Sequence, residues 1–294
     1  MSSNDPAVVT CALTGVLTNP ARFPVPVTPE EMADAAEQAW NAGATVLHCH
    51  YRNQEPGMGF MPSWEPDVVA SIDAAIRDRV PQMIINMSTG VVGDDISGPV
   101  ACLERIRPEV AAMNAGSLNY LKVKRDGTWA WPPLLFDNTV DKIERFLEVM
   151  DKLNVVPECE CFDTGIVRSI AMLQQRGLLK APVHVSFVMG VASGMPAKAS
   201  WLPLLVDELN ENVHWQTIAI GRDEVWEVHS KTAELGGHLR TGLEDTFYLP
   251  NGEKATSNGQ LIEAIVAGAR EVGREIATVD QARGILGVEG SRAA

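Results

Sequence analysis

Two histidines one residue apart are the clearest chemical signal in this sequence. His48 and His50 end the run ATVLHCH at residues 44–50, whose apolar and β-branched residues are typical of a buried strand. Side chains two apart on a strand point to the same face, so both imidazoles leave the strand end together and can bind one divalent metal ion. The pair therefore predicts two ligands of a catalytic metal site.

Segment 236–245, GGHLRTGLED, supplies candidates for a third metal ligand and for a catalytic base. Catalytic zinc commonly takes two histidines and one carboxylate, with an open position for water or substrate, and Glu244 can be that carboxylate. Asp245 would stand beside the metal as a base that accepts a proton from a carbon acid. Arg240 could orient Asp245 or neutralise the charge of a developing enolate. We expect Zn²⁺ at His48, His50 and Glu244, with another divalent metal as the alternative.

Strand and helix patterns alternate along the chain and would position these groups. The predicted strands are Val8–Leu13, Thr45–His50, Gln82–Asn86, Val110–Asn114, Val155–Glu160, Val183–Val188, Trp215–Ala219 and His238–Arg240. The helical patterns include Pro29–Ala42, Val140–Leu153, Gly165–Arg176, Ser200–Leu209, Glu224–Leu235 and Gly259–Ile276. A strict β-then-α order over about 250 residues is typical of an α/β fold closed as a (β/α)₈ TIM barrel, with catalytic groups at the carboxyl ends of the strands.

A doubly wound open sheet is the alternative fold. Its glycine-rich dinucleotide motif would follow the first strand, where the sequence LTGVLT at residues 13–18 has one glycine only. Polar clusters also end five of the predicted strands, and in a barrel these clusters converge on one mouth. We therefore expect residues 1–294 to form a single TIM-barrel catalytic domain.

Composition excludes several classes of partner. The net charge of −14 leaves no basic face for a phosphate backbone, so we expect no nucleic-acid partner. The amino-terminal residues carry no basic and apolar signal region, and no apolar run is long enough to span a bilayer. These features predict a soluble cytoplasmic protein without a membrane partner. The five scattered cysteines indicate reduced core thiols rather than a disulfide framework.

A second metal site is conceivable around Cys159 and Cys161, which with the two histidines could form a closed four-ligand zinc centre. On the predicted strand, Glu158 and Glu160 share one face and the two cysteines share the other. We therefore expect Glu160 to face the barrel interior and the thiols to face the helices, which ranks this centre below the first. The remaining histidines, such as His229, are expected to be core or surface residues.

Ordered motifs along the chain resemble the β-keto acid cleavage enzyme family, typified by 3-keto-5-aminohexanoate cleavage enzyme. They are VTCALTG at 9–15, HCHYR at 48–52, STG at 88–90, MNAGS at 113–117, ECFD at 160–163, GMP at 194–196, GGH at 236–238 and GLED at 242–245. The resemblance implies a zinc-dependent barrel, usually a homotetramer, that exchanges acyl groups between a β-keto acid and acetyl-CoA, its co-substrate. The products would be acetoacetate and a new acyl-CoA.

The resemblance also implies residue roles. His48, His50 and Glu244 would hold zinc, and Asp245 would be the general base, helped by Arg240. Ser88 and the loop from Asn114 to Ser117 would hold the carboxylate end of the keto acid, and we include the inward-facing Glu160 among the substrate-binding residues. No nucleophilic side chain is required, because the enolate of the keto acid attacks the thioester and the freed thiolate completes the cleavage.

Three positions depart from the family pattern and bear on substrate choice. Leu17 stands where the characterised member has an acidic residue that meets its substrate's ammonium group, which favours a keto acid with an uncharged, apolar tail. Val91 replaces a glycine that often follows the STG motif, and Ala115 replaces a threonine. The carboxylate pocket therefore loses a hydroxyl and gains bulk.

Residues 121–133 are predicted to form a hairpin, because an Asp126-Gly127 turn separates two β-prone arms. Three roles stay open for it: packing on a neighbouring subunit, binding of CoA phosphates by its cations, or an aromatic cage in which Trp129, Trp131 or Tyr51 holds a quaternary ammonium tail.

Two further functions remain as alternatives to acyl exchange. One is a metal-dependent aldolase or hydrolase that uses the same residues without CoA. The other is a metal-stabilised binding barrel without turnover, which the base beside an open metal position argues against.

Overall fold

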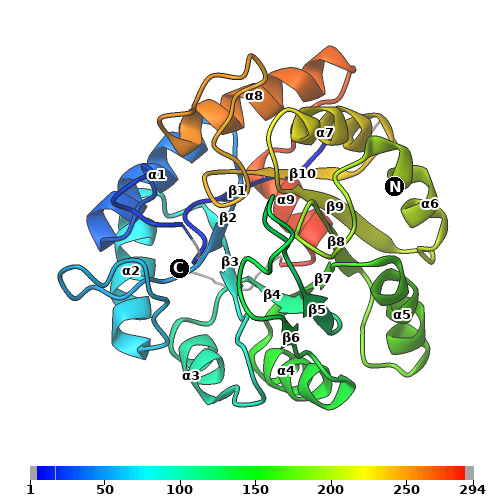
Figure 1. The fold of residues 1–294 in the computed structure, drawn as a ribbon, viewed down its shortest axis with the longest axis horizontal. Coiled ribbons are helices and arrows are strands. Elements are labelled where there is room, and N and C mark those ends of the chain that lie inside the picture. Colours follow the sequence, from blue (N-terminus) through cyan, green and yellow to red (C-terminus); the bar gives the residue numbers. More distant parts are fainter. Residues whose placement is uncertain (1–4, 17, 289–294) are drawn as a thin grey trace.

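The protein is a closed parallel barrel, seen in a computed structural model that describes residues 5–16 and 18–288. Eight strands follow one another around it in the order β1-β10-β9-β8-β7-β4-β3-β2, and helices form an outer ring (Figure 1). The barrel strands are β1 Val9–Ala12, β2 Val46–Cys49, β3 Ile84–Ser88, β4 Val110–Asn114, β7 Val156–Cys161, β8 Val183–Met189, β9 Val213–Ala219 and β10 His238–Thr241. The predicted TIM barrel is confirmed, with strand bounds within a few residues of those expected.

Each barrel strand is followed by a helix. The helices are α1 Pro29–Ala42, α2 Pro66–Arg79, α3 Ser97–Ile106, α4 Val140–Leu153, α5 Thr164–Gln175, α6 Leu202–Asp207, α7 Glu224–Glu234, α8 Asn258–Glu271 and α9 Val279–Leu286. Local sequence explains why α1 begins where predicted, because Thr28 and Glu31 form a reciprocal capping box ahead of Pro29. None of the described helices is long and apolar enough to cross a bilayer.

Two helical predictions need correction. A 3₁₀ turn at Ala199–Trp201 and the short α6 replace the predicted helix over 200–209. Helix α8 ends at Glu271 rather than Ile276, because Gly273 adopts a left-handed conformation with φ +80° and Arg274 turns inward. The Arg274 guanidinium donates to the carbonyls of Ala233 and Gly236 at 3.1 and 2.9 Å. Helices α2, α3 and α9 were not among the predicted segments.

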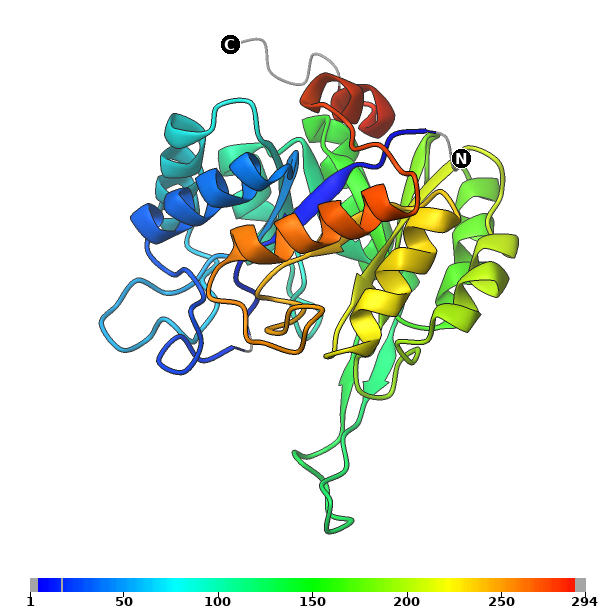
Figure 2. The ribbon, with the colours of Figure 1, turned by 90° about the horizontal axis from the view of Figure 1, so that it is seen from above.

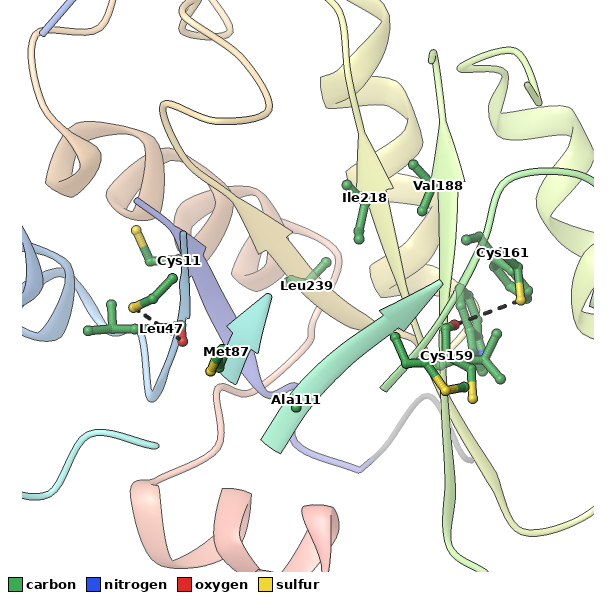
Figure 3. Packing of buried hydrophobic residues seen from close by; sticks show 14 of the residues in the cluster. Cys11, Leu47, Met87, Ala111, Cys159, Cys161, Val188, Ile218 and Leu239 are labelled. Atoms are coloured by element: carbon green, nitrogen blue, oxygen red, sulfur yellow. Dashed lines mark hydrogen bonds between the residues drawn. The ribbon is translucent and has the colours of Figure 1, made fainter. Parts of the chain in front are cut away.

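The main core lies between the strands and the ring of helices. Alternate strand residues such as Leu47, Met87 and Ala111 point into this layer (Figure 3). The cysteines lie in the same layer, and all five are buried and free, as predicted. Cys161 Sγ donates to the carbonyl of Cys159 at 3.8 Å (Figure 3). The Glu158 and Glu160 side chains consequently face the barrel interior.

Helix α9 covers the amino-terminal end of the barrel. Its Ala282 and Leu286 pack with Val8, just before β1, and with the first residues of β2, β3 and β4 in a small separate cluster. Figure 2 shows α9 in red at this end, opposite the side from which a long hairpin projects. The carboxyl ends of the strands therefore form the face available for chemistry.

The hairpin stands away from the barrel on that face (Figure 2). It is built on β5 Leu118–Tyr120 and β6 Leu134–Phe136, which pair in antiparallel fashion. Val123 and Trp129 form a further antiparallel bridge, and Gly127 takes φ +83° in the turn. The predicted hairpin is thus confirmed, and residues 118–136 are called the arm below.

Candidate active site

The predicted metal ligands meet at the carboxyl ends of β2 and β10. Both strands pair with β1, which brings His48 and His50 to Glu244 across a single strand. Glu244 Oε1 lies 3.7 Å from His48 Nε2 and 3.4 Å from His50 Nε2. Among the described residues, these three are the histidine, cysteine and acidic side chains whose ligand atoms lie close enough together to share one ion. The alternative centre with Cys159 and Cys161 is not formed.

The state of these side chains fits a divalent metal. Burial lowers the pKa of His48 well below its ordinary value, so its imidazole is neutral and has a lone pair to offer. Burial opposes ionisation of Glu244, but the neighbouring His50 and the positive charge of Arg240 outweigh it and hold the pKa of this carboxyl well below its usual range. Glu244 Oε2 is buried and has no hydrogen-bond partner in the described structure. Two imidazoles and a carboxylate with an unsatisfied buried oxygen form a donor set suited to zinc.

Gly15 and Arg52 hold the loop after β1 against the site. Gly15 has φ +56°, and a Cβ atom there would lie 2.8 Å from Glu244 Cγ, so a larger residue would displace the carboxylate. The Arg52 guanidinium is buried and donates to the carbonyls of Thr14 and Gly15 at 2.6 and 2.9 Å. It also donates to the Thr18 and Gly59 carbonyls. Arg52 is thus a structural clamp rather than a ligand of substrate.

Asp245 does not belong to the metal cluster. It lies 3% exposed and accepts two hydrogen bonds from Arg240, one from Nε and one from Nη2. Arg240 Nη2 also donates to Glu244 Oε1 at 3.0 Å. Burial and the charge of Glu244 raise the pKa of Asp245, while Arg240 acts in the opposite direction. A buried carboxyl with a raised pKa beside a metal cluster is suited to proton transfer near neutral pH.

Glu160 reaches the same arginine from β7. Its Oε1 lies 3.5 Å from Arg240 Nη1, a buried nitrogen that otherwise has no hydrogen-bond partner in the described structure. Burial raises the pKa of Glu160 to about 8, although Arg240 opposes the shift. The prediction that Glu160 faces the interior is confirmed by this contact. Its position next to Arg240 leaves it able to donate or accept a proton near the site.

A polar group that sequence reasoning did not assign lies beneath the metal ligands. Asn86 neighbours His48 in the β2–β3 register. Asn86 Nδ2 donates to Glu158 Oε2 at 2.7 Å, and Ser186 donates to the other carboxylate oxygen at 2.8 Å. All of these side chains are buried. The sequence signal that could have identified this group is that Asn86 and Glu158 are polar residues at strand positions that face the barrel interior.

The predicted substrate-binding residues surround the ends of β3 and β4. A Cβ at Gly90 would lie 3.3 Å from Asn114 Nδ2 and 3.7 Å from Ser88 Oγ, so the STG turn sits against Asn114. Ala115 is buried, and its N–H donates to the Glu160 carbonyl at 2.9 Å. These residues form one edge of the mouth.

Other predicted positions lie further out. The Val91 carbonyl accepts a hydrogen bond from buried Lys142, which braces the loop after β3. Ser117 is exposed, and its hydroxyl accepts from the N–H of Asn138 at 2.8 Å. Tyr51 is buried in the main core and so cannot line an aromatic cage. Leu17 lies outside the described residues.

Comparison with known proteins places this geometry in a family. The family model described as beta-keto acid cleavage enzyme matches residues 6–288. The chain belongs to the β-keto acid cleavage enzyme family. The resemblance inferred from the motifs is thereby confirmed, and the barrel with its cluster of histidines and acids is the scaffold of an enzyme.

Curated relatives match over almost their full length. A 3-oxoadipate:acetyl-CoA acetyltransferase of Cupriavidus necator is 33% identical over 293 residues, covering 96% of this chain and 95% of the relative. A 3-keto-5-aminohexanoate cleavage enzyme of Fusobacterium nucleatum is 33% identical over 289 residues, covering 96% and 98%. A 3-dehydrocarnitine:acetyl-CoA trimethylamine transferase of Rhizobium meliloti is 29% identical, covering 96% and 97%. The tails of the substrates in these names differ widely, so the family's chemistry tolerates changes at the tail.

A solved structure supports the fold of this β-keto acid cleavage enzyme. The apo structure of ObcA superposes with a TM-score of 0.71 at 20% identity, covering 90% of this chain and 65% of ObcA. At that level of identity the likeness concerns the barrel alone.

Proposed function

We propose that this β-keto acid cleavage enzyme exchanges acyl groups between a β-keto acid and acetyl-CoA. The keto acid would give up its acyl group to CoA, and the acetyl group would join the remaining fragment, so that the products are acetoacetate and a new acyl-CoA. The observation that carries this proposal is the buried Arg240–Asp245 pair set directly against Glu244 of the metal cluster. Acetyl-CoA appears in the names of relatives that match nearly the whole chain, which supports it as co-substrate.

His48, His50 and Glu244 would hold one Zn²⁺, or another divalent metal. When bound there, such an ion withdraws electron density from the oxygens of a keto acid and makes the intervening methylene more acidic. The three ligands project from one end of the barrel, and Arg240 and Asp245 lie on the side of Glu244. An ion held by these three residues would therefore have Asp245 close by as a base.

Asp245 would remove a proton from the carbon between the two carbonyl groups. Arg240 holds the carboxylate through two hydrogen bonds and keeps a positive charge beside the enolate as it forms. The enolate carbon attacks the acetyl thioester and expels the CoA thiolate. The thiolate then attacks the original keto carbon, and the carbon–carbon bond breaks to give the new thioester and the enolate of acetoacetate. This enolate takes back the proton held by Asp245, which releases acetoacetate and restores the base. Glu160, in contact with Arg240, would bind substrate on the far side of the site.

The carboxylate of the keto acid would lie at the edge formed by Ser88, Asn114 and Ala115, with Val91 and Ser117 further out. Ser88 supplies a hydroxyl there, whereas Ala115 supplies only a methyl group. The tail would point toward Leu17, and an apolar side chain at this position favours an uncharged, apolar tail.

The test is to incubate the purified protein with a divalent metal, ¹³C-acetyl-CoA and a panel of β-keto acids. The expected result by mass spectrometry is labelled acetoacetate together with an unlabelled acyl-CoA that carries the acyl group of the keto acid. Cleavage of the keto acid with no change in acetyl-CoA would instead support a metal-dependent aldolase or hydrolase. Metal binding without turnover of any keto acid would support a binding barrel.

We further propose a cytoplasmic homo-oligomer, a tetramer as in the family resemblance, with one catalytic domain per chain and no nucleic-acid or membrane partner. The net charge of −14 argues against nucleic acid.

A further inference from the structure

The arm is the part of this molecule that the proposed chemistry does not use. It leaves the barrel between β4 and α4 and extends outward, with little of its length against the body (Figure 2). At its base, the N–H of Leu121 donates to Ser193 Oγ at 3.0 Å, and Ser193 donates to the Asn119 carbonyl. A two-stranded hairpin that stands alone in water is marginally stable at best. We therefore expect packing against another protein surface to stabilise the arm.

The arm exposes an apolar face. Val123 and Trp129 lie opposite each other across its two strands, with 55% and 49% of their surfaces exposed. Leu134 and Leu135, which point to opposite faces of β6, are also exposed, at 42% and 51%. These four belong to twelve large apolar side chains that are exposed in the described part of the chain, although the arm is a small fraction of it. Such a concentration of exposed apolar side chains is typical of a protein contact surface.

Charge indicates what covers this face. The arm carries a formal charge of +2, from Lys122, Lys124 and Arg125 against Asp126, so the rest of a chain whose net charge is −14 carries −16. None of the arm's three cations forms a salt bridge with any described residue. The surface most complementary to a basic, apolar arm is therefore the acidic body of another copy of this chain.

Two other roles for the arm are less consistent with its contacts. Trp131 is already stacked by Tyr120, with ring centroids 5.5 Å apart, and Lys122 Nζ lies 5.7 Å from the centre of the same ring. A quaternary ammonium group would have to compete with that cation. Lys124 and Arg125 stand at the tip of the arm, on its outward end, and CoA phosphates bound there would leave Val123 and Trp129 uncovered.

We infer that residues 118–136 form an assembly arm, whose Val123–Trp129 face docks on the acidic surface of a second copy of the same chain. The inference rests on the proposed homo-oligomer and names the element that builds it. In a symmetric pair, each copy gives an arm and receives one, so the contact is made twice.

The experiment compares sedimentation of the full chain with that of Val123→Ser/Trp129→Ser and of Lys124→Glu/Arg125→Glu. The parent should sediment at a multiple of 31.8 kDa. The apolar variant should dissociate at concentrations roughly 30-fold higher than the parent, the effect of losing a central aromatic contact. The charge variant should dissociate more readily at low salt, and added salt should reduce its difference from the parent. Met172→Ser/Leu204→Ser is the matched control, because it removes two exposed apolar side chains from α5 and α6.

Each result decides a separate point. A parent that sediments as a single chain at every concentration overturns both the oligomer and the arm contact. An assembled parent whose arm variants remain fully assembled overturns the arm contact and leaves the oligomer standing. Arm variants with unchanged mass and a raised KM for acetyl-CoA would assign the arm to CoA binding and overturn the contact between copies.

Discussion

Asp245 accepts two hydrogen bonds from one arginine, at 3.2 Å from Arg240 Nε to Oδ2 and 3.2 Å from Nη2 to Oδ1. Both residues are almost fully buried, so neither can turn toward solvent. The pair fixes the direction of the Asp245 carboxylate, and the same arginine also donates to Glu244 Oε1. This geometry supports the proposed division of roles between two adjacent carboxylates, in which Glu244 would be the metal ligand and Asp245 the base.

Replacing Asp245 with Asn tests the base. The amide keeps the size of the side chain but cannot accept the proton, so turnover should fall by about 10²-fold or more, while metal content is retained. Turnover is measured as acyl-CoA formation, and metal content by atomic absorption. Asp141→Asn is the control, because that carboxylate is exposed on α4 far from the ligands. Activity within a few-fold of the parent would remove Asp245 from the proton transfer.

Replacing His48 with Ala tests the metal site. The variant loses one of three protein ligands, so the protein should no longer retain one metal ion per chain after dialysis, while far-ultraviolet circular dichroism stays unchanged. His229→Phe serves as the control, since His229 is a buried histidine on α7 with no place in the cluster. A His48→Ala protein that keeps a full complement of metal would show that the ion lies elsewhere.

The sequence was sufficient to predict the strands and the principal cluster, because polar residues at the ends of apolar strands are unexpected unless they do chemistry. Glu244 could be placed near His48 because a barrel makes its first, second and last strands neighbours. The Asn86–Glu158 hydrogen bond joins residues 72 positions apart on strands that are not adjacent. The pattern of residues within either strand therefore could not predict it. The function of Arg52 was equally hidden, because its partners are backbone carbonyls that any residues would provide.

Asn86→Ala tests whether the polar group beneath the site supports the metal. Asn86 lies between His48 and the Glu158 carboxylate, and groups that orient a ligating histidine typically contribute about 10- to 100-fold to metal affinity. We expect a loss of that size in competition with a chromophoric chelator. Ser186→Ala is the matched control, because it removes a different hydrogen bond to Glu158 and leaves Asn86 in place. Equal affinity in the Asn86→Ala variant and the parent would exclude this role.

Buried neutral histidines predict a loss of stability on acidification. Burial lowers the pKa of His229 to about 3, against about 6.5 in an unfolded chain. Between pH 6.5 and pH 3, His229 is protonated in the unfolded chain but neutral in the folded protein. The free energy of unfolding therefore falls by about 1.4 kcal/mol for each pH unit in this range because of this residue. The contribution is complete above pH 6.5.

His229→Phe should remove this dependence. The difference in unfolding free energy between variant and parent, measured by urea titration, should move in favour of the variant by about 1 to 2 kcal/mol between pH 7 and pH 5. Met172→Leu, an exposed change without a titrating group, should leave the difference constant. A constant difference for His229→Phe as well would mean that the imidazole binds a proton equally readily in the folded and unfolded chains.

Leu17 is expected to set the polarity of the substrate tail. An ammonium group beside a leucine would be desolvated without a counter-charge, at a cost of several kcal/mol that an alkyl tail does not incur. The parent should therefore turn over short alkyl β-keto acids best, and Leu17→Glu should shift preference toward an amino-bearing substrate by supplying a partner for its charge. Leu17→Gln, of similar size and without the charge, is the control. Turnover is compared for alkyl, amino and trimethylammonium analogues. If the parent processes the cationic analogues best, the apolar tail is wrong, and the charge must be met by groups other than residue 17.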